Sequence, residues 1–442
     1  MPTPRMPHGL IYAVLVAMAL ALAGTAAAQT PPRRDIHLGV ASCAGNNCHG
    51  AVKPPPGASM PLDQFLIWSQ KDKHRLAYAS LSSELGQRIA RNLGLPDAKT
   101  AQICLDCHAD NVPQEQRGRQ FDLADGVGCE ACHGAAVGWL GVHLSGAGHK
   151  ANLAAGMYPT DQPLARAQLC LSCHFGTDKK FVTHQIMGAG HPPMPFELDT
   201  YTMIEPAHFV VDKNYMARKG KPNDAQIWAV GQAVDLLKRT EAMLDPKHAP
   251  QGLNPELVLF DCQSCHHSVK HLEWQPRKAG IGPGKLRIYD ASAVMLDIAA
   301  GRVAPDAAKT LSDQMVALHQ ATTKDWNQVQ QAATAVRQLT NQLIPMLTSH
   351  DFNRDDLKAL ANGIIDAGTT GEASEFSQAQ QATMALASVV ATMRLDGFAT
   401  ADQLKSMNMA LAALFEAVGN DETYEPDAFV KALQGFKGTL PQ

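Results

Sequence analysis

The sequence predicts a mainly α-helical protein in two parts, and two observations carry this prediction. The first is a cysteine and histidine motif that occurs five times between Cys43 and His266 and contains all ten cysteines of the 442-residue chain. The second is the Gly/Pro-rich linker at 280–285, after which the chain is cysteine-free, alanine-rich and helical in its periodicity. We therefore predict a motif-bearing domain at 29–279 and an all-α helical bundle at 286–442.

The amino terminus predicts export. Arg5 precedes an apolar run from Leu10 to Ala23, and three alanines ending at Ala28 follow it. This pattern is typical of a secretory signal peptide, so we expect residues 1–28 to be cleaved and the mature protein to be periplasmic. An uncleaved membrane anchor, which would bring contact with the membrane, is the alternative because the run extended to Ala28 approaches a spanning length.

Each motif places a histidine directly after the second of two nearby cysteines. The first motif runs from Cys43 to His49, and the second to fifth, which have the spacing C-x-x-C-H, begin at Cys104, Cys129, Cys170 and Cys262. Two cysteines at this spacing can bond to the vinyl groups of a haem, and the histidine can then bind its iron. Disulfide loops or zinc sites are the alternative, but a histidine follows all five pairs and the spacing groups no set of four zinc ligands.

The motifs therefore predict five covalently bound haems c (heme c). The predicted thioether anchors are Cys43, Cys48, Cys104, Cys107, Cys129, Cys132, Cys170, Cys173, Cys262 and Cys265. The predicted proximal iron ligands are His49, His108, His133, His174 and His266. With one motif for about every 45 residues and only 6% aromatic residues, this region should consist of short helices and long loops around stacked haems that form its core.

A second axial ligand for each iron must come from elsewhere in the chain, and neutral imidazole is the usual supplier. The candidates among the spare histidines are His74, His143, His184, His191 and His208. A surface histidine, or one bonded to a haem propionate, is the alternative for each. Met187 and Met194 are further candidates, although gap-filling in the core is the commoner role of methionine.

Composition excludes one class of partner and suggests another. The formal net charge is −4, and no basic excess points to nucleic acid. One basic patch, formed by Lys213, Arg218, Lys219 and Lys221, could steer an acidic redox partner, with a solvated loop as the alternative.

The region 286–442 predicts about five or six antiparallel helices. Leu404, Met407, Leu411 and Leu414 keep one apolar face, and Thr400 opens a capping box. A partner surface is the alternative to an ordinary bundle core. We expect His319 and His350 to lie on the surface, and the sequence assigns no chemistry to this part.

Residues 37 to about 275 resemble a family of multihaem cytochromes c related to the tetrahaem electron acceptor of hydroxylamine oxidoreductase. The resemblance rests on the first motif with its flanks, on the block from Trp68 to Leu81, on the third motif with its flanking glycines, and on the ten-residue step from His133 to His143. The fifth motif departs from the four-haem pattern of that family.

The resemblance also implies ligand pairs. His74 would pair with His133, and His143 with His49. One of His184, His191 and His208 would pair with His174. In that family the second haem lacks a distal protein ligand, so the iron at His108 would either be fully ligated or have an open position.

These observations predict a periplasmic multihaem cytochrome that transfers electrons between redox partner proteins, either periplasmic or membrane-bound. The alternative is a reductase or oxidase of a small nitrogen or sulfur species at a haem with an open axial position, with His108 as the first candidate. A third hypothesis is a structural subunit whose helical domain docks the cytochrome onto a membrane quinol enzyme.

Overall fold

The computed structural model describes residues 34–54, 60–250, 255–266, 277, 281–282 and 285–441. Within them the protein is mainly α-helical, which confirms the predicted fold class. Isolated bridges are the β-structure found there, and they join His37 to Arg117, Gly176 to Phe181 and Phe260 to Ile288. The predicted signal peptide at 1–28 lies outside these residues. No helix in this part of the chain combines the length and the apolarity that crossing a membrane requires.

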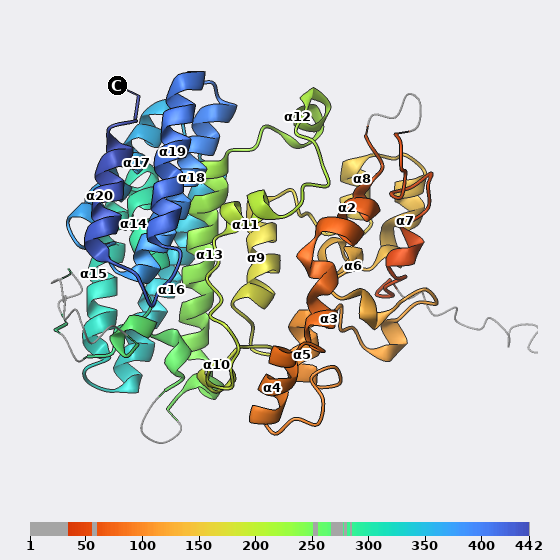
Figure 1. The fold of residues 1–442 in the computed structure, drawn as a ribbon, viewed down its shortest axis with the longest axis horizontal. Helices are drawn as coiled ribbons and strands as arrows, with labels where there is room; N and C mark the ends of the chain where they lie inside the picture. The colour runs from red at the N-terminus through yellow and green to blue at the C-terminus, as the bar shows by residue number, and fades with distance from the viewer. Residues whose placement is uncertain are drawn as a thin grey trace, which may run out of the picture.

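Short helices joined by loops make up the region of the first four motifs. Its α-helices are α2 (Gln64–Lys71), α3 (Ala77–Ser80), α4 (Glu84–Asn92), α5 (Gln102–His108), α6 (Cys129–His133), α7 (Ala136–Leu144), α8 (His149–Ala154), α9 (Pro163–His174), α10 (His184–Gly188), α11 (Leu198–Ile204) and α12 (Lys213–Lys219). The 3-10 helices are η2 (Val40–Ser42), η3 (Lys73–Leu76), η4 (Gln114–Gln116) and η5 (Leu123–Asp125), with η6 (Pro246–His248), η7 (Leu257–Leu259) and η8 (Cys262–Ser264) near the fifth motif. Figure 1 shows α2 to α8 gathered at the end of the molecule away from the carboxy terminus.

Three of the four narrow motifs occupy the last turn of a helix. α5, α6 and α9 end at His108, His133 and His174. Residues three apart in a helix lie on the same side, so the two cysteines of each motif face one way. Gly134, with φ at 76°, ends α6 directly after its histidine in a conformation that glycine adopts without strain. Each of these motifs is therefore presented at a helix end.

The carboxy-terminal part contains seven helices rather than the five or six predicted. They are α14 (Ala291–Val303), α15 (Pro305–Ala321), α16 (Trp326–Ser349), α17 (Arg354–Thr369), α18 (Phe376–Leu395), α19 (Ala401–Ala417) and α20 (Pro426–Lys437). Only Ala304 separates α14 from α15, a break too short to interrupt the alanine-rich pattern. The predicted capping box is present, because Thr400 and Gln403 each accept the other's backbone N–H.

α13 (Asp224–Leu244) belongs to the bundle although it precedes the predicted linker at 280–285. Its Trp228 is fully buried in one hydrophobic core that extends from Ala167 in α9 to Phe436 in α20. In Figure 1 α13 lies between the bundle helices and α9, and it packs closely against α16. The predicted division at 280–285 is therefore not a boundary in packing, since α9 and α13 share the core of α14 to α20.

Buried polar contacts attach α13 to the bundle. Gln232 Nε2 donates to Gln381 Oε1 at 2.8 Å. α11 approaches α13 at Gly231, where a Cβ atom would lie 2.7 Å from the Cβ of Leu198. This close approach needs glycine. α11 thereby packs directly against α13.

The two histidines predicted on the surface of the bundle differ from that expectation. His319 is buried, and its Nδ1 faces the carbonyl oxygen of Met315 at 2.8 Å. His350 is half-buried and bonds Asp356 through Nε2 at 2.9 Å. The helical pattern did not reveal either contact, because both partners lie on other turns or elements.

Candidate functional site

Each motif histidine faces one of the five candidate distal histidines. The ring centroids are separated by 6.0 Å in His49–His143, 6.2 Å in His174–His74, 6.4 Å in His108–His191, 6.2 Å in His133–His208 and 6.4 Å in His266–His184. We call these the five facing pairs. Their interplanar angles range from 18° to 90°, so ring stacking does not explain the common spacing.

The common spacing fits a metal between the rings. A metal–imidazole bond is about 2.0–2.1 Å long, and a ring centre lies about 1 Å beyond the nitrogen, so two imidazoles on one metal have centroids about 6 Å apart. Helices and loops far apart in sequence supply the five pairs, yet the spread is 0.4 Å between 6.0 Å and 6.4 Å. The residues present therefore fit an iron held between two histidines at each motif.

The structure places the distal candidates differently from the pairing that the resemblance implied. His143 lies beside His49, in agreement with that pairing. His74 faces His174 instead of His133, which faces His208. The reason is that η3 places the ring of His74 beside His174, the last residue of α9. His191 faces His108, and His184 faces His266.

Hydrogen bonds hold the Nδ1 atom in several of these rings. His49 Nδ1 faces Gln64 Oε1 at 2.8 Å. His108 Nδ1 faces the carbonyl oxygen of Ala77 at 3.0 Å, and His191 Nδ1 faces that of Pro192 at 2.9 Å. An acceptor at Nδ1 fixes the tautomer and leaves Nε2 as the ligand atom, which is the usual arrangement around metal-bound histidines.

Asn152 provides a further test of the fit at His143. Its buried Oδ1 has no hydrogen-bond partner, while its Nδ2 lies 3.2 Å from His143 Nδ1. Rotating the amide by 180° exchanges the two atoms and gives Oδ1 an Nδ1–H donor. A histidine that binds iron through Nε2 carries that proton on Nδ1. The orphaned oxygen is therefore satisfied when His143 is an axial ligand.

Two half-buried motif histidines have pKa values that favour the neutral ring at pH 7, as iron ligation requires. Burial lowers the pKa of His133 to about 4, with the charges of His208 and Lys219 acting in the same direction. Burial also lowers the pKa of His174 to about 4.

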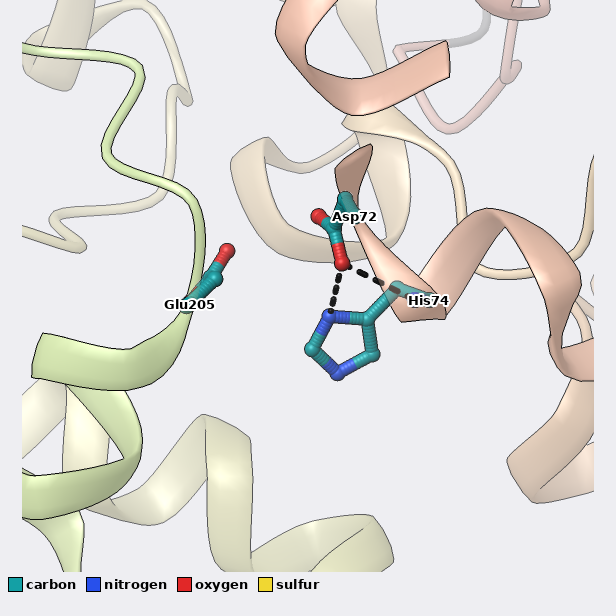
Figure 2. A group of neighbouring side chains, drawn as sticks. All are labelled: Asp72, His74 and Glu205. Atoms are coloured by element: carbon teal, nitrogen blue, oxygen red, sulfur yellow. Dashed lines mark hydrogen bonds and ion pairs between the residues drawn. The ribbon is translucent and has the colours of Figure 1, made fainter. Parts of the chain in front are cut away.

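A carboxylate supports the histidine of η3. Asp72 accepts hydrogen bonds from the backbone N–H of His74 at 2.9 Å and from its Nδ1 at 3.1 Å, as Figure 2 shows. The side chain of Glu205 approaches from the end of α11, and ligand atoms of the three residues lie within 4.8 Å of one another. Burial raises the pKa of Glu205. Because Nδ1 is bonded to Asp72, Nε2 of His74 is the atom available toward His174.

The cysteines show which motifs are neighbours in space. All ten are among the described residues, and no two of them form a disulfide. Cys43 of the first motif lies close enough to Cys129 of the third for each to shift the pKa of the other, and the same holds for Cys107 of the second and Cys173 of the fourth. Electrostatic interactions link Cys132 of the third motif to the fourth. The first four motifs therefore follow one another in the order first, third, fourth, second.

The region around the facing pairs is rich in apolar side chains, but few of them are buried against one another. The buried cluster beside α3 to α5 contains Leu81, Ala90, Ala98, Leu105 and Ala109. Large exposed apolar side chains are concentrated in the same part of the chain, among them Leu76, Ile103, Leu144, Ile204 and Val210. Such side chains fit contact with flat apolar groups such as porphyrins.

Other histidines of this region bond elsewhere. His37 Nδ1 lies 2.7 Å from Asp110, and His149 Nε2 lies 2.9 Å from Asp161. His248 Nδ1 faces the carbonyl oxygen of Ala242 at 3.0 Å. The sequence reasoning missed the supporting residues Asp72 and Asn152. The position of Asp72, two residues before His74, is a local signal that could have identified it. Asn152 lies nine residues after His143 and gives no such signal.

The first part of the motif region matches the model of a known family. Residues 42–134 match the model of the family described as cytochrome c554 and c-prime. The match contains the first three motifs and supports a multihaem c-type cytochrome that carries covalently bound haem c and takes part in electron transfer. No curated protein and no solved structure matches the chain.

Proposed function

We propose that the protein is a periplasmic cytochrome that transfers electrons between redox partner proteins through five covalently bound haems, each held by two histidines. The observation that carries the proposal is the set of five facing pairs, with centroids 6.0–6.4 Å apart at all five motifs. Bound haem supplies a one-electron couple, and the chain's residues hold the irons and bring them close together.

The chain itself supports a continuous order of the five centres. The thiol contacts give the order first, third, fourth, second. Lys180 reinforces the contact between the fourth and second motifs, because its Nζ donates to Cys173 Sγ at 2.9 Å and to the carbonyl oxygen of Asp106 at 3.0 Å. Electrons entering at one end of such a series would leave at the other.

The segment around α10 joins the fifth motif to this series. It contributes His191 to the pair at the second motif and His184 to the pair at the fifth. Asn92 of α4 donates to the carbonyl oxygen of Ala189, and Glu256 accepts from the backbone N–H of His184 at 2.7 Å. One short segment therefore spans the two centres, and the fifth extends the order beyond the second.

The alternative, reduction or oxidation of a small substrate, needs an iron with an open position. His108 was the first candidate for that role, and the ring of His191 lies beside it at the same distance as in the other pairs. This contact favours the electron-transfer proposal over the enzymatic one.

Electron paramagnetic resonance of the oxidised holoprotein, with haem and iron quantified in the same sample, tests the proposal. We expect five haems per chain, all low-spin, and a spectrum that cyanide leaves unchanged. Five haems with one high-spin, cyanide-binding iron would favour the enzymatic alternative. Fewer than five haems would contradict the proposed cofactor content.

An Asp72→Asn variant is expected to raise the reduction potential of the haem between His74 and His174. A carboxylate bonded to the outer ring nitrogen makes the ligand more basic, which favours Fe(III) over Fe(II). If the ratio of the Fe(III) to the Fe(II) stability falls tenfold, the reduction potential rises by about 59 mV. Spectropotentiometric titration at pH 7 measures the shift. Asp122→Asn is the matched control, because Asp122 also caps a 3-10 helix but accepts from the backbone N–H of Ala124 instead of from a histidine. An unchanged or lower potential in Asp72→Asn would contradict this role.

A further inference from the structure

A buried network of charged side chains connects the fifth motif to the bundle. Asp261, which directly precedes Cys262, lies 3.3 Å from Arg287 Nη2. Arg287 also forms two hydrogen bonds to Glu375, which lies just before α18. Arg277 Nη1 reaches the same carboxylate at 3.4 Å, and its Nη2 bonds Asp290 at 2.7 Å. We call these five residues the charged cluster.

The charged cluster is unbalanced. It contains three carboxylates, Asp261, Asp290 and Glu375, against two guanidinium groups. The exposed fractions of these side chains are 1% for Asp261, 4% for Arg277, 5% for Asp290, 10% for Arg287 and 19% for Glu375. An uncompensated charge is costly in such surroundings, and protonation of one carboxylate removes it.

Other charged and titratable groups adjoin the cluster. His319 Nε2 lies 3.4 Å from Asp290, and Gln378 donates to the other oxygen of Asp290 at 2.6 Å. Glu372 acts on Arg277 electrostatically. On the side of the fifth motif the neighbours are Asp235 and Arg239 of α13, Tyr289 and Asp421.

A cavity gives the cluster a route to water. It has a volume of about 250 Å³, and its lining includes Arg277, Asp290 and His319 together with the exposed Asp366. The Nε atom of Arg277 is buried without a hydrogen-bond partner. The lining mixes apolar side chains with these polar ones, and a cavity that offers polar partners and room for several waters is usually hydrated.

We propose that the charged cluster is a proton-binding site, and that it takes up one proton from solvent when the haem of the fifth motif gains one electron. This inference rests on the proposed function, because it requires a haem at Cys262 and Cys265. The electron comes from the neighbouring redox centre and converts Fe(III) to Fe(II), while the proton converts one carboxylate to its acid. Charge is conserved, since one negative and one positive charge enter together.

Asp261 is the group that accepts the proton. Burial raises its pKa to about 6, with Glu375 and Asp290 acting in the same direction and Arg287 opposing them. The pKa of Asp290 is instead lowered, because Arg277 and His319 outweigh the effect of burial. With this pKa, Asp261 is ionised above about pH 6. Reduction of the nearby iron adds negative charge and raises proton affinity, so the potential falls as pH rises above this value.

Redox titrations of the holoprotein between pH 5 and pH 8 test the inference. A variant with Cys262→Ala and Cys265→Ala identifies which potential belongs to the fifth haem, because that potential is missing from it. In the unmodified chain we expect this potential to be constant at low pH and to fall above about pH 6. The slope should approach 59 mV per pH unit, because one pH unit is a tenfold change in proton concentration and one proton is taken up per electron.

Glu375→Gln is expected to abolish this slope, because two carboxylates then balance two guanidinium groups. Asp261→Asn should also abolish it and serves as the second variant if Glu375→Gln does not fold. Asp366→Asn, an exposed residue at the rim of the cavity, is the matched control and should retain the slope. A slope that persists in both cluster variants would place the proton elsewhere and overturn the inference.

The outcomes separate this inference from the proposed function. A fifth haem whose potential does not change with pH would overturn the inference alone. A chain that binds only four haems, as measured by haem quantification, would contradict the proposed function as well.

Discussion

A His191→Ala variant is expected to contain one high-spin, five-coordinate haem iron among five. The imidazole of His191 lies opposite His108 with centroids 6.4 Å apart. It is half-buried on a loop after α10, and Gly190 before it adopts φ at 118°. Alanine keeps the backbone but supplies no ligand, and its small side chain leaves space for an exogenous molecule on that face of the iron. The spectrum should show one high-spin ferric signal per chain.

Cyanide titration completes this test. We expect one cyanide bound per chain of His191→Ala and none bound by the unmodified protein. His149→Ala is the matched control, because His149 lies in the same region but bonds Asp161 and faces no motif histidine. A low-spin spectrum in His191→Ala, identical to that of the control, would mean that another residue ligates the iron at His108.

Trp228→Ala is expected to lower the free energy of unfolding by about 3–5 kcal/mol, the usual cost of truncating a large buried aromatic residue. Trp228 is fully buried in α13, at the centre of the core that α9 shares with the bundle. The fourth motif is the carboxy-terminal turn of α9. The loss should therefore appear in both the bundle and the motif region. We expect a lower denaturant midpoint for helix content and for the haem absorbance.

Trp228→Phe is the matched control. The indole Nε1 of Trp228 is buried without a hydrogen-bond partner, so its removal relieves an unsatisfied donor while most of the apolar contact remains. We expect this variant to lose much less stability than Trp228→Ala. Equal losses would show that the site tolerates no change of shape. A midpoint shift confined to helix content would show that the bundle and α9 unfold independently.

The sequence was sufficient to predict the helical fold class and to name the histidines that face one another. Cysteine spacing is a local property, so a short stretch of sequence is enough to recognise each motif. Pairing is not local. Whether His74 reaches His133 or His174 depends on where η3 and α9 pack, and no spacing in the sequence records this. The sequence likewise does not predict that Cys43 and Cys129 are neighbours in space.

The limits of the bundle were missed for a related reason. Glycine and proline at 280–285 mark a break in the chain, but a break does not reveal which core the preceding helices join. α13 carries buried residues on nearly all sides, as a central helix does, and it lies between α9 and α16. His319 was misplaced because its contacts with Asp290 and Ile288 come from another element.

The positions of the paired histidines along the chain have a consequence for assembly. A chain that crosses a membrane amino end first delivers its first three motifs before His143, His191 and His208. The fourth and fifth motifs emerge after their own partners, His74 and His184. The irons of the first three centres would thus have only their motif histidine when the motif emerges. The irons of the last two could bind both histidines as soon as their motifs emerge. The second and third centres then gain their second histidine only when the segment between α10 and α12 has crossed, because it carries His191 and His208.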